Sequence, residues 1–437
     1  MKFLEKASFL IIFLITSTIF IFSCSSKNNT NTGSEVKKPY RVIVSSDIGG
    51  TDPDDNQSMI HLLMYSDLFQ IEGLIASPYG NGRKGNILEM IDLYEKDLSK
   101  LRKHSDGFPD PDSLRAICKQ GGISNAPYKG FDNPTEGSEW IIKCAKKPSD
   151  QPLWVLVWGG IEDLAQALHD APEIKEKIKV YWIGGPNKKW GVNAYAYIAE
   201  NHPDLWMIEA NATYRGWFLD SDSPEKLNNE SFYPNFIKER GALGKAFKSY
   251  YEGEIKMGDT PSLVYVMNGN PHDPLGESWG GSFTPLVRSS KYVFNGNTTL
   301  LDTVVAYATI EWKYKGPELV IPEDSACFTL EISGQSWPGY YLGDGTYGVR
   351  YSSKKPEICT YKTSSSIPEL NGHTGQFVSI TPWPGKPNKD DLILGENWFS
   401  DRPETEFFIG VQQGTKTVAK HREKFLMDWA DRWKWLE

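Results

Sequence analysis

The stretch RVIVSSDIGGTDPDDNQSMIHLLMYSDLFQIEGLIAS, residues 41–77, decides the fold of this chain. Its first five residues, 41–45, form a short β-branched run that is typical of a buried parallel strand. Pro53 and the Asp pair that follows it are typical of a helix start, and later apolar residues carry a helical face. Residues 71–76 form a second apolar run. The stretch therefore predicts a strand–loop–helix–strand unit.

The loop of this unit is strongly acidic. It carries Asp47, Asp52, Asp54 and Asp55, which repel one another unless a cation or a helix N-terminus compensates their charge. A solvated acidic turn is one interpretation. However, the loop follows a strand end, where open α/β sheets bind their ligands. Together with the flexible Gly-Gly pair, this position favours a site for a hard cation with oxygen ligands, and Ca²⁺ suits it.

Further strand and helix signals follow along the chain. Residues 153–157 and 179–183 are apolar runs that end in WGGIED (158–163) and GGPN (184–187), and a helical run begins at Leu164. Strands that alternate with helices predict an α/β fold with a doubly wound, mostly parallel sheet, here expected over residues 39–289. Asp259 precedes another apolar run, so it is either a helix N-cap or a ligand of the same pocket.

The region 290–405 has a different pattern, with many short alternating runs among Gly and Ser residues. This pattern predicts a β-rich insertion. Its aromatic residues are either a sugar-stacking surface or ordinary core; they are Trp337, Tyr340, Tyr341, Tyr347, Trp383 and Trp398. The last segment, 406–437, contains a Trp-rich helical pattern that we expect to pack back on the α/β domain.

Composition excludes several classes of protein. The 437 residues include 47 Lys and Arg against 56 Asp and Glu, a net charge of −9, so no basic face for a nucleic acid polymer is expected. With 39% hydrophobic and 13% aromatic residues, most of the chain cannot be disordered. Beyond Cys24, the cysteines could pair as 118–144 and 327–359, or be buried small hydrophobic residues.

The N-terminus has the pattern of a targeting signal. Within residues 1–23, Lys2 and Lys6 precede an apolar run over 9–22, and the run ends just before Cys24. This resembles the cleavage box of a bacterial lipoprotein; a membrane-spanning anchor is the alternative. The polar residues 24–38 predict a flexible tether. We expect an outer-membrane lipoprotein that is anchored in the membrane by lipid on Cys24 and faces the periplasm or the cell surface.

Five ordered motifs carry a family resemblance. They are SDIGGTDPDD (46–55), NKKWGVNAYAYIAENHPDLWMIE (187–209), MGDTPSLVYV (257–266), ESWGGSF (277–283) and REKFLMDWADRWKW (422–435). The first resembles the opening loop of inosine–uridine-type nucleoside hydrolases. The whole set is similar to the nucleoside-hydrolase-like domain of bacterial cellulose-binding proteins.

The resemblance implies a Ca²⁺ site and a general base. The implied metal ligands are Asp47, Asp55, a backbone carbonyl in the turn at Glu162, and Asp259. Three carboxylates, a carbonyl and water form a reasonable shell for a hard ion. Asp47 would also take a proton from metal-bound water, whose pKa the cation lowers.

The resemblance also implies sugar-binding residues, namely Asp54, Asn81 and Asn193. The acidic loop is longer here than in nucleoside hydrolases, so Asp52 could take over a role of its neighbours. Two departures affect the leaving-group side of the site. Gly191 stands where those enzymes carry a Glu, and Gly258 where some carry a His; His272 could replace that acid.

Two functions are therefore expected, both with a small ribosyl or carbohydrate ligand. The first is a calcium-dependent hydrolase of N-glycosidic or related glycosyl bonds. The alternative is a carbohydrate-binding lipoprotein that keeps the nucleoside-hydrolase fold without turnover. A purely structural calcium site is a third interpretation of the same carboxylates.

Overall fold

The computed structural model describes residues 38–50, 52–77, 83–219 and 227–437. The expected signal sequence, Cys24, most of the tether and Asn81 lie outside these ranges. In the described ranges, no helix combines the length and the apolar character that crossing a membrane requires. Residues 39–437 form one compact unit.

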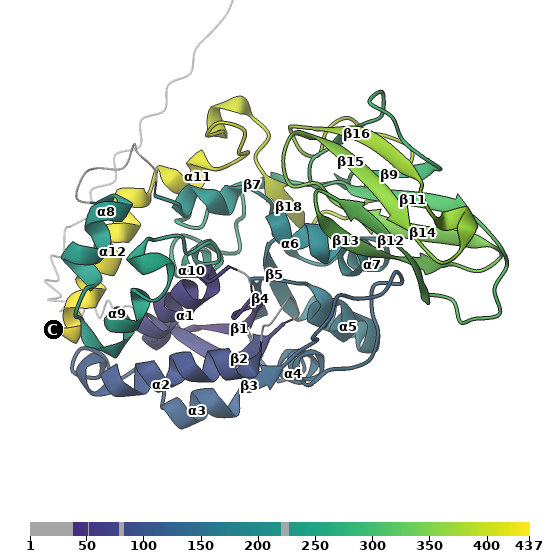
Figure 1. Ribbon diagram of the computed structural model, residues 1–437. Coiled ribbons are helices and arrows are strands. Elements are labelled where there is room, and N and C mark those ends of the chain that lie inside the picture. Colours follow the sequence, from purple (N-terminus) through teal and green to yellow (C-terminus); the bar gives the residue numbers. More distant parts are fainter. Residues whose placement is uncertain (1–37, 51, 78–82, 220–226) are drawn as a thin grey trace, which may run out of the picture. The chain divides into compact units, whose positions relative to one another are not determined.

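The first part of the chain builds an eight-stranded sheet (Figure 1). Its strands are, in spatial order, β3 (Cys118–Gln120), β2 (Phe69–Ala76), β1 (Tyr40–Ser46), β4 (Leu153–Val157), β5 (Ile178–Ile183), β6 (Met207–Ala210), β18 (Trp398–Asp401) and β7 (Phe283–Pro285). All neighbouring pairs are parallel except β18 and β7. The predicted α/β fold with a mostly parallel sheet is confirmed.

Helices cover both faces of this sheet because its strands are apolar on both sides. On β1, Val42 and Val44 belong to one core cluster and Ile43 to the other, as the alternation of side chains along a strand requires. The helices that pack into the first cluster are α1 (Asp54–Met64), α2 (Lys84–Leu101), α3 (Pro111–Ala116), α8 (Asn229–Phe232), α9 (Gly241–Phe247), α10 (Thr260–Met267), α11 (Lys416–Ala419) and α12 (Arg422–Trp433). Those that pack into the second are α4 (Glu136–Ala145), α5 (Glu162–Asp170) and α7 (Val192–Asn201).

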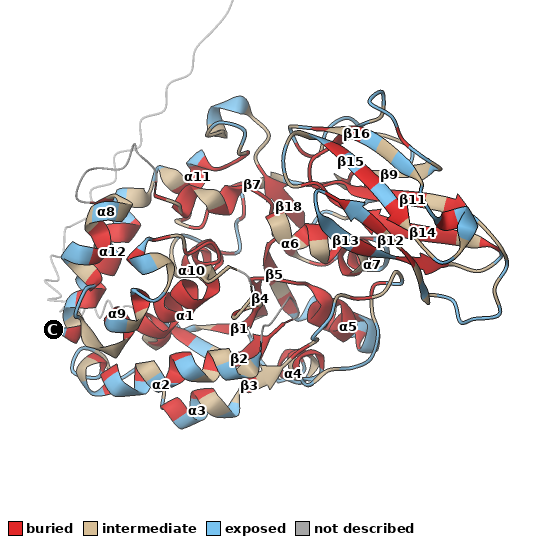
Figure 2. Ribbon diagram, in the orientation of Figure 1, coloured by how far each residue is buried: buried red, intermediate tan, exposed pale blue. Residues whose placement is uncertain are grey.

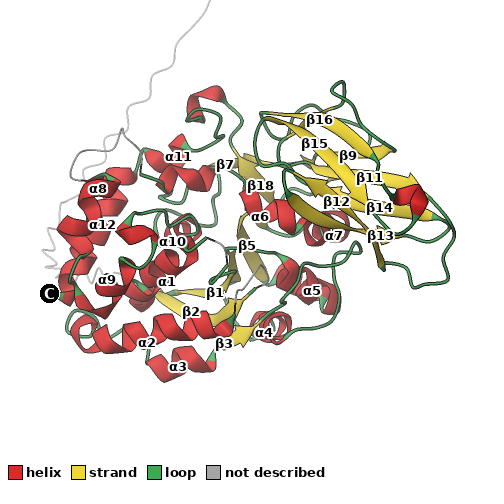
Figure 3. Cartoon of the chain, in the orientation of Figure 1, coloured by secondary structure: helices red, strands yellow, loops and turns green. Residues whose placement is uncertain are grey.

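A second eight-stranded sheet forms the β-rich region, which is separate from the first sheet in Figure 3. Its strands are, in spatial order, β10 (Thr303–Val305), β16 (Thr374–Ile380), β15 (Glu357–Ser364), β12 (Ala326–Ile332), β13 (Gln335–Tyr341), β14 (Thr346–Tyr351), β11 (Thr309–Lys315) and β9 (Lys291–Asn295). A small ribbon pairs β8 (Arg288–Ser289) with β17 (Leu392–Ile393). The chain then returns to the first sheet as β18, which lies inside the range 290–405 that the sequence assigned to the insertion.

The aromatic residues of this region form core rather than a sugar-stacking surface. All six that the sequence singled out are less than 9% exposed: Trp337, Tyr340, Tyr341, Tyr347, Trp383 and Trp398. Figure 2 shows the buried residues alternating with exposed ones along these strands. Of the two interpretations, ordinary core is confirmed. Trp337, Tyr341 and Tyr347 belong to the core of the second sheet, whereas Trp383 and Trp398 belong to a core cluster of the first sheet.

The terminal helix and the cysteines are also part of the core. The side chains of α12 that the sequence identified as apolar, including Trp429 and Trp433, belong to the same cluster as α1 and β1. The four described cysteines are free thiols, so neither disulfide pair is present. Cys118 and Cys144 lie in different core clusters, on opposite faces of the first sheet, which prevents their pairing.

A buried ion pair links α6 (Gly185–Trp190) to the first sheet. The Lys188 ammonium donates to Glu209 Oε1 at 2.7 Å, and both side chains are fully buried. Three further donors satisfy the same carboxylate: Tyr195 Oη at 2.7 Å, Asn211 Nδ2 at 2.8 Å and Trp398 Nε1 at 3.2 Å. The hydrogen bond from Trp398 therefore helps to hold β18, the last parallel strand, in register with β6.

Replacing Glu209 with Ala is expected to cost about 3–5 kcal/mol in the free energy of unfolding, because Lys188 stays buried without a counter-charge. The matched control is Glu173→Ala. Its partner Lys146 lies 2.7 Å away, but both side chains are more than half exposed, so a loss below about 1 kcal/mol is expected. Urea unfolding of the three proteins measures both values; equal losses would contradict the prediction.

Candidate functional site

The site begins where β1 ends. Residue 49 has a φ of 86°, a conformation that glycine adopts without strain, and the Gly50 amide donates to the Asp47 carbonyl at 2.9 Å. This tight turn places the Asp47 side chain against Gly159 at the end of β4. A Cβ on Gly159 would lie 2.6 Å from Asp47 Cγ, so only glycine at this position allows the carboxyl group to occupy that space.

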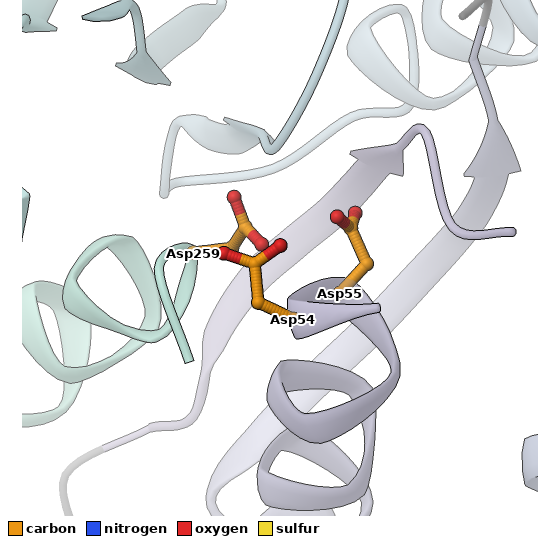
Figure 4. Close-up of side chains that lie close together, drawn as sticks. All are labelled: Asp54, Asp55 and Asp259. Atoms are coloured by element: carbon orange, nitrogen blue, oxygen red, sulfur yellow. The ribbon is translucent and has the colours of Figure 1, made fainter. Parts of the chain in front are cut away.

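Asp259 reaches the same place from α10. It is the N-cap residue of α10, as one interpretation predicted, but its side chain makes no capping hydrogen bond. Its Oδ2 is buried and has no hydrogen-bond partner. Ligand atoms of Asp54, Asp55 and Asp259 lie within 4.8 Å of one another, and Figure 4 shows the three carboxylates gathered between the first turn of α1 and the start of α10.

These residues line a pocket of about 380 Å³. Five carboxylates reach it: Asp47, Asp52, Asp54, Asp55 and Asp259. Four of them come from one loop at the carboxyl end of β1, and the fifth from α10, which packs beside α1. The position agrees with the rule that open α/β sheets bind ligands beyond the carboxyl ends of their strands.

Burial makes this carboxylate set electrostatically costly. Burial, together with the charge of Asp54, raises the pKa of Asp47 to about 7. The pKa values of Asp54, Asp55 and Asp259 are raised well above the usual range, first by burial and then by the neighbouring carboxylates. These four carboxyl groups cannot all be ionised at neutral pH unless a positive charge lies between them.

Protein groups supply only part of that charge. Lys256 forms an ion pair with Asp52 and lies 3.6 Å from Asp54 Oδ2, while the Gly258 amide donates to the same oxygen at 3.2 Å. Asp55 accepts a hydrogen bond from the Ser46 hydroxyl. Asp259 Oδ2 has no partner. An all-oxygen set with an orphaned buried carboxylate oxygen fits a hard divalent cation.

Two of the sequence-predicted site residues do not line this pocket with their side chains. The Glu162 side chain is buried without a hydrogen-bond partner and lines another pocket; the predicted ligand is the backbone carbonyl in its turn, which stays a prediction. Burial raises the pKa of the Glu162 side chain to about 8. Asn193 donates to the Ala126 carbonyl at 3.2 Å and does not line the carboxylate pocket either. The residue of the β4 turn that does line it is Trp158.

His272 is not available as a leaving-group acid. Its Nδ1 lies 2.9 Å from the Lys179 ammonium, and its ring packs against Tyr40 and Trp154. Tyr40 and Lys179 begin or nearly begin their strands. His272 therefore sits at the opposite edge of the sheet from the pocket, and this expectation is wrong.

Several pocket residues escaped the sequence analysis. Asn187 and Trp190 come from α6, and Arg215 from the 3₁₀ helix η3 (Thr213–Trp217). Gln335 and Lys354 come from the β-rich region. The strand-end GGPN motif is a usable signal for Asn187. Trp190 lies in the motif over residues 187–209 that carries the family resemblance. Nothing in the local pattern around Arg215, Gln335 and Lys354 distinguishes them from surface or core residues, because distant packing brings them to the pocket.

The family of the chain follows from its sequence. The family model described as "Cellulose-binding Sde182, nucleoside hydrolase-like domain" matches residues 41–283, more than half of the chain. The chain therefore belongs to this family of nucleoside hydrolase-like domains. A second match, over residues 303–366 of the β-rich region, is to a domain of unknown function, DUF5060. No match was found among curated proteins.

Solved structures with a similar fold were also found. A nucleoside hydrolase-related hypothetical protein from Saccharophagus degradans, associated with carbohydrate metabolism, is 19% identical; the match covers 79% of this chain and 100% of that one, with a TM-score of 0.48. The inosine-uridine preferring nucleoside hydrolase from Bacillus anthracis is 16% identical, with coverages of 58% and 86% and a TM-score of 0.39. The purine-preferring ribonucleoside hydrolase from Gardnerella vaginalis is 14% identical, with coverages of 57% and 84% and a TM-score of 0.39.

Without a divalent cation, we expect the fold to lose stability as the pH rises from about 6.5 to about 8. The folded-state pKa of Asp47 is about 7 and its ordinary value is 3.8, so the folded state holds a proton that the unfolded state has released. That contribution is complete below pH 3.8 and is lost as the pH rises through 7. The buried histidines His61 and His202, with folded-state pKa values of about 3 and 4, are neutral in the folded state throughout this window. In the unfolded state they lose their remaining protons as the pH rises above 6.5, which opposes the decrease slightly.

Thermal unfolding in the presence of a chelator measures this effect. Lys179 and Lys188, with pKa values of about 8, act in the opposite direction near the upper end of the window, and equally in every variant. The melting temperature of the wild type should fall by several degrees across the window. Asp47→Asn should reduce the decrease without abolishing it, because burial also raises the pKa of Asp401 to about 7 and that of Glu162 to about 8. Asp204→Asn, an exposed control, should leave the decrease unchanged. A decrease of the same size in Asp47→Asn would contradict the assignment.

Proposed function

We propose that this protein is a calcium-dependent hydrolase of N-glycosidic or related glycosyl bonds in a small ribosyl or carbohydrate substrate. The observation that carries the proposal is the carboxylate pocket: five aspartates at one strand end, one of them with a buried oxygen that has no partner. Membership of a nucleoside hydrolase-like family supports the same reaction class. Calcium is the proposed ion because the donors are all oxygen atoms and several carboxylates are available.

Asp54, Asp55 and Asp259 would hold the ion, because their ligand atoms already lie within 4.8 Å of one another. Asp47 shares the pocket but stands outside that triad. When bound, the ion would lower the pKa of a water molecule and orient the sugar hydroxyls. Asp54, which the sequence analysis assigned to sugar binding alone, therefore becomes a candidate for both roles.

Asp47 is the proposed general base. Its pKa of about 7 places it where a carboxylate can accept a proton at neutral pH. A side-chain hydrogen bond with Asp55 orients it toward the triad. The other carboxylates would stabilise the positive charge that develops on the sugar ring in an oxocarbenium-like transition state.

Sugar hydroxyls would be bound by Asp52, Asp54 and Asn187. The amide nitrogen of Asn187 donates to the Ile183 carbonyl at 2.9 Å, which fixes the side chain at the pocket wall. Asn187 takes the place proposed for Asn193 in the sequence analysis, because only Asn187 lines the pocket. Asn81 remains a proposed sugar ligand from outside the described residues.

A second function has a specific observation in its favour. Among the described residues that line the pocket there is no histidine, and Gly258 contacts Asp54 where a leaving-group acid could otherwise stand. A site with a cation and sugar-binding groups but no acid would bind a carbohydrate without cleaving it. The alternative is therefore a carbohydrate-binding lipoprotein.

Asp47→Asn separates the two functions. For a hydrolase, we expect this change to lower turnover of nucleosides or nitrophenyl glycosides by about 10²–10⁴-fold, because it removes the general base. Binding of free ribose, measured by calorimetry, should change little. Chelation should abolish wild-type turnover, and added calcium should restore it.

Asp259→Asn tests the ion separately through the melting temperature. Calcium should raise the melting temperature of the wild type. It should raise the melting temperature of the Asp259 variant much less. The matched control is Asp163→Asn, a buried aspartate whose carboxylate is satisfied by Thr135 and Gly122 outside the pocket; it should keep the calcium response. If calcium acts equally on all three proteins, the proposed ion site is wrong. If calcium binds and no glycosyl bond is cleaved, the binding protein is favoured.

We also propose export and lipid attachment at Cys24. The basic start, the apolar run and the Ser-Cys junction support it. Expressed in a bacterial host, the wild type should partition with the membrane fraction and Cys24→Ala should be released. Cys118→Ala is the control and should remain with the membrane. Membrane association of the Cys24 variant would contradict the lipid anchor.

A further inference from the structure

Positive side chains line the same pocket as the carboxylates. They are Arg215, Lys256 and Lys354. All three are partly exposed, as are Asp47, Asp52 and Asp54, whereas Asp55 and Asp259 are buried. We define Arg215 and Lys354 as the cationic rim of the pocket, because both are more exposed than Asp55 and Asp259 and because Lys256 is already bound to Asp52.

Arg215 has no carboxylate partner among the described residues. Its guanidinium lies over the rings of Tyr214 and Phe218, at 5.2 and 5.8 Å from their centroids, and both rings line the pocket. Its Nε is buried without a hydrogen-bond partner. Aromatic packing holds the guanidinium in place. The Tyr214 side chain also forms a hydrogen bond with it and the Asp54 charge attracts it, so only its remaining donors are available to a ligand.

Lys354 reaches the pocket from the β-rich region. It belongs to the segment between β14 and β15, and it forms no ion pair within the parts of the chain that the structure describes. Its charge lowers the pKa of Lys256 and that of Lys189, although burial is the main cause in both. Repulsion from two neighbouring ammonium groups is unfavourable unless an anion relieves it.

The β-rich region is fixed to the pocket wall at this point. The ring of Trp337 stacks on Trp190 with centroids 4.8 Å apart, and its Nε1 donates to the Lys189 carbonyl at 3.0 Å. Gln335 accepts a hydrogen bond from the Lys189 ammonium and also lines the pocket. Lys354 is therefore carried by a region that packs against α6 and is held in place at the pocket.

The charges also permit an anionic ligand. The pocket lining contains five carboxylates and three cations, so a bound divalent cation makes the lining neutral as a whole. An anion at the rim then meets no net repulsion, and it would be separated from the interior carboxylates by the sugar itself.

We propose that the pocket binds a sugar derivative that carries an anionic group, a phosphate or a carboxylate, and that Arg215 and Lys354 bind this group. The inference deepens the proposed function by naming the substrate class of the same site. The β-rich region is then a specificity element, because it supplies one of the two cations. Charge-assisted hydrogen bonds from a guanidinium and an ammonium are the expected contacts.

Calorimetry on the calcium-loaded mature chain tests the proposal with two pairs of probes. Ribose 5-phosphate is compared with ribose, and glucuronic acid with glucose. In at least one pair the anionic member should bind about tenfold or more tightly than its neutral partner. The pair that shows the advantage identifies the anion, and raising the salt concentration should reduce the advantage.

Lys354→Gln should remove most of this advantage while leaving the affinity for the neutral sugar unchanged. The matched control is Lys355→Gln, the exposed neighbour that pairs with Glu357 at 3.7 Å, and it should keep the advantage. Arg215→Gln provides a second test, from the 3₁₀ helix η3 of the first part of the chain. This design also separates rim binding from direct contact between phosphate and calcium, which the Lys354 change would not affect.

Equal affinity for both members of each pair, or no binding of any anionic probe, would overturn the inference. An anion advantage that survives both rim substitutions would also overturn it. The proposed hydrolase is tested independently by turnover. Cleavage of neutral glycosides without an anion advantage refutes only the inference, and an anion advantage without any cleavage refutes only the hydrolase.

Discussion

The mutual repulsion of five aspartates in one pocket is the constraint around which this structure is organised. A buried carboxylate is costly unless a charge or hydrogen bonds compensate it, and here burial and neighbouring charges raise the pKa values of four of them. Ser46, Gly258 and Lys256 compensate part of this cost. Protonation or a cation relieves the remaining part, so the acidic cluster fits a cation-binding site better than a packing element.

The strands and helices that flank the acidic loop are tightly packed. The sheet is covered on both faces by helices, and its strand β1 is buried at almost every position. Close contacts at glycine, such as Gly159 against Asp47, leave no room for another residue. Because the loop is fixed at both ends, by β1 and by α1, its carboxylates cannot move apart to relieve their repulsion.

The second sheet changes what the site can recognise. Loops of the β-rich region bring Gln335 and Lys354 to a pocket whose floor belongs entirely to the first part of the chain. Two contacts hold α6 in place. Trp337 stacks on Trp190 of this helix, and Lys188 of the same helix forms the buried ion pair with Glu209. A nucleoside hydrolase-like site without this region would lack one cation of the rim.

The sequence by itself determined the α/β architecture, the β-rich region and the acidic end of the first strand. These follow from local patterns: β-branched runs, helix-start residues and charge spacing within a few residues of one another. It also placed Asp259 in the site, although by resemblance and not by spacing. The tertiary structure decided which carboxylates come close together, that Asn187 lines the pocket where Asn193 does not, and that His272 lies at the opposite edge. It also placed Arg215 and Lys354 at the rim. Such placements depend on how distant segments pack, and neither periodicity nor local charge pattern contains that information.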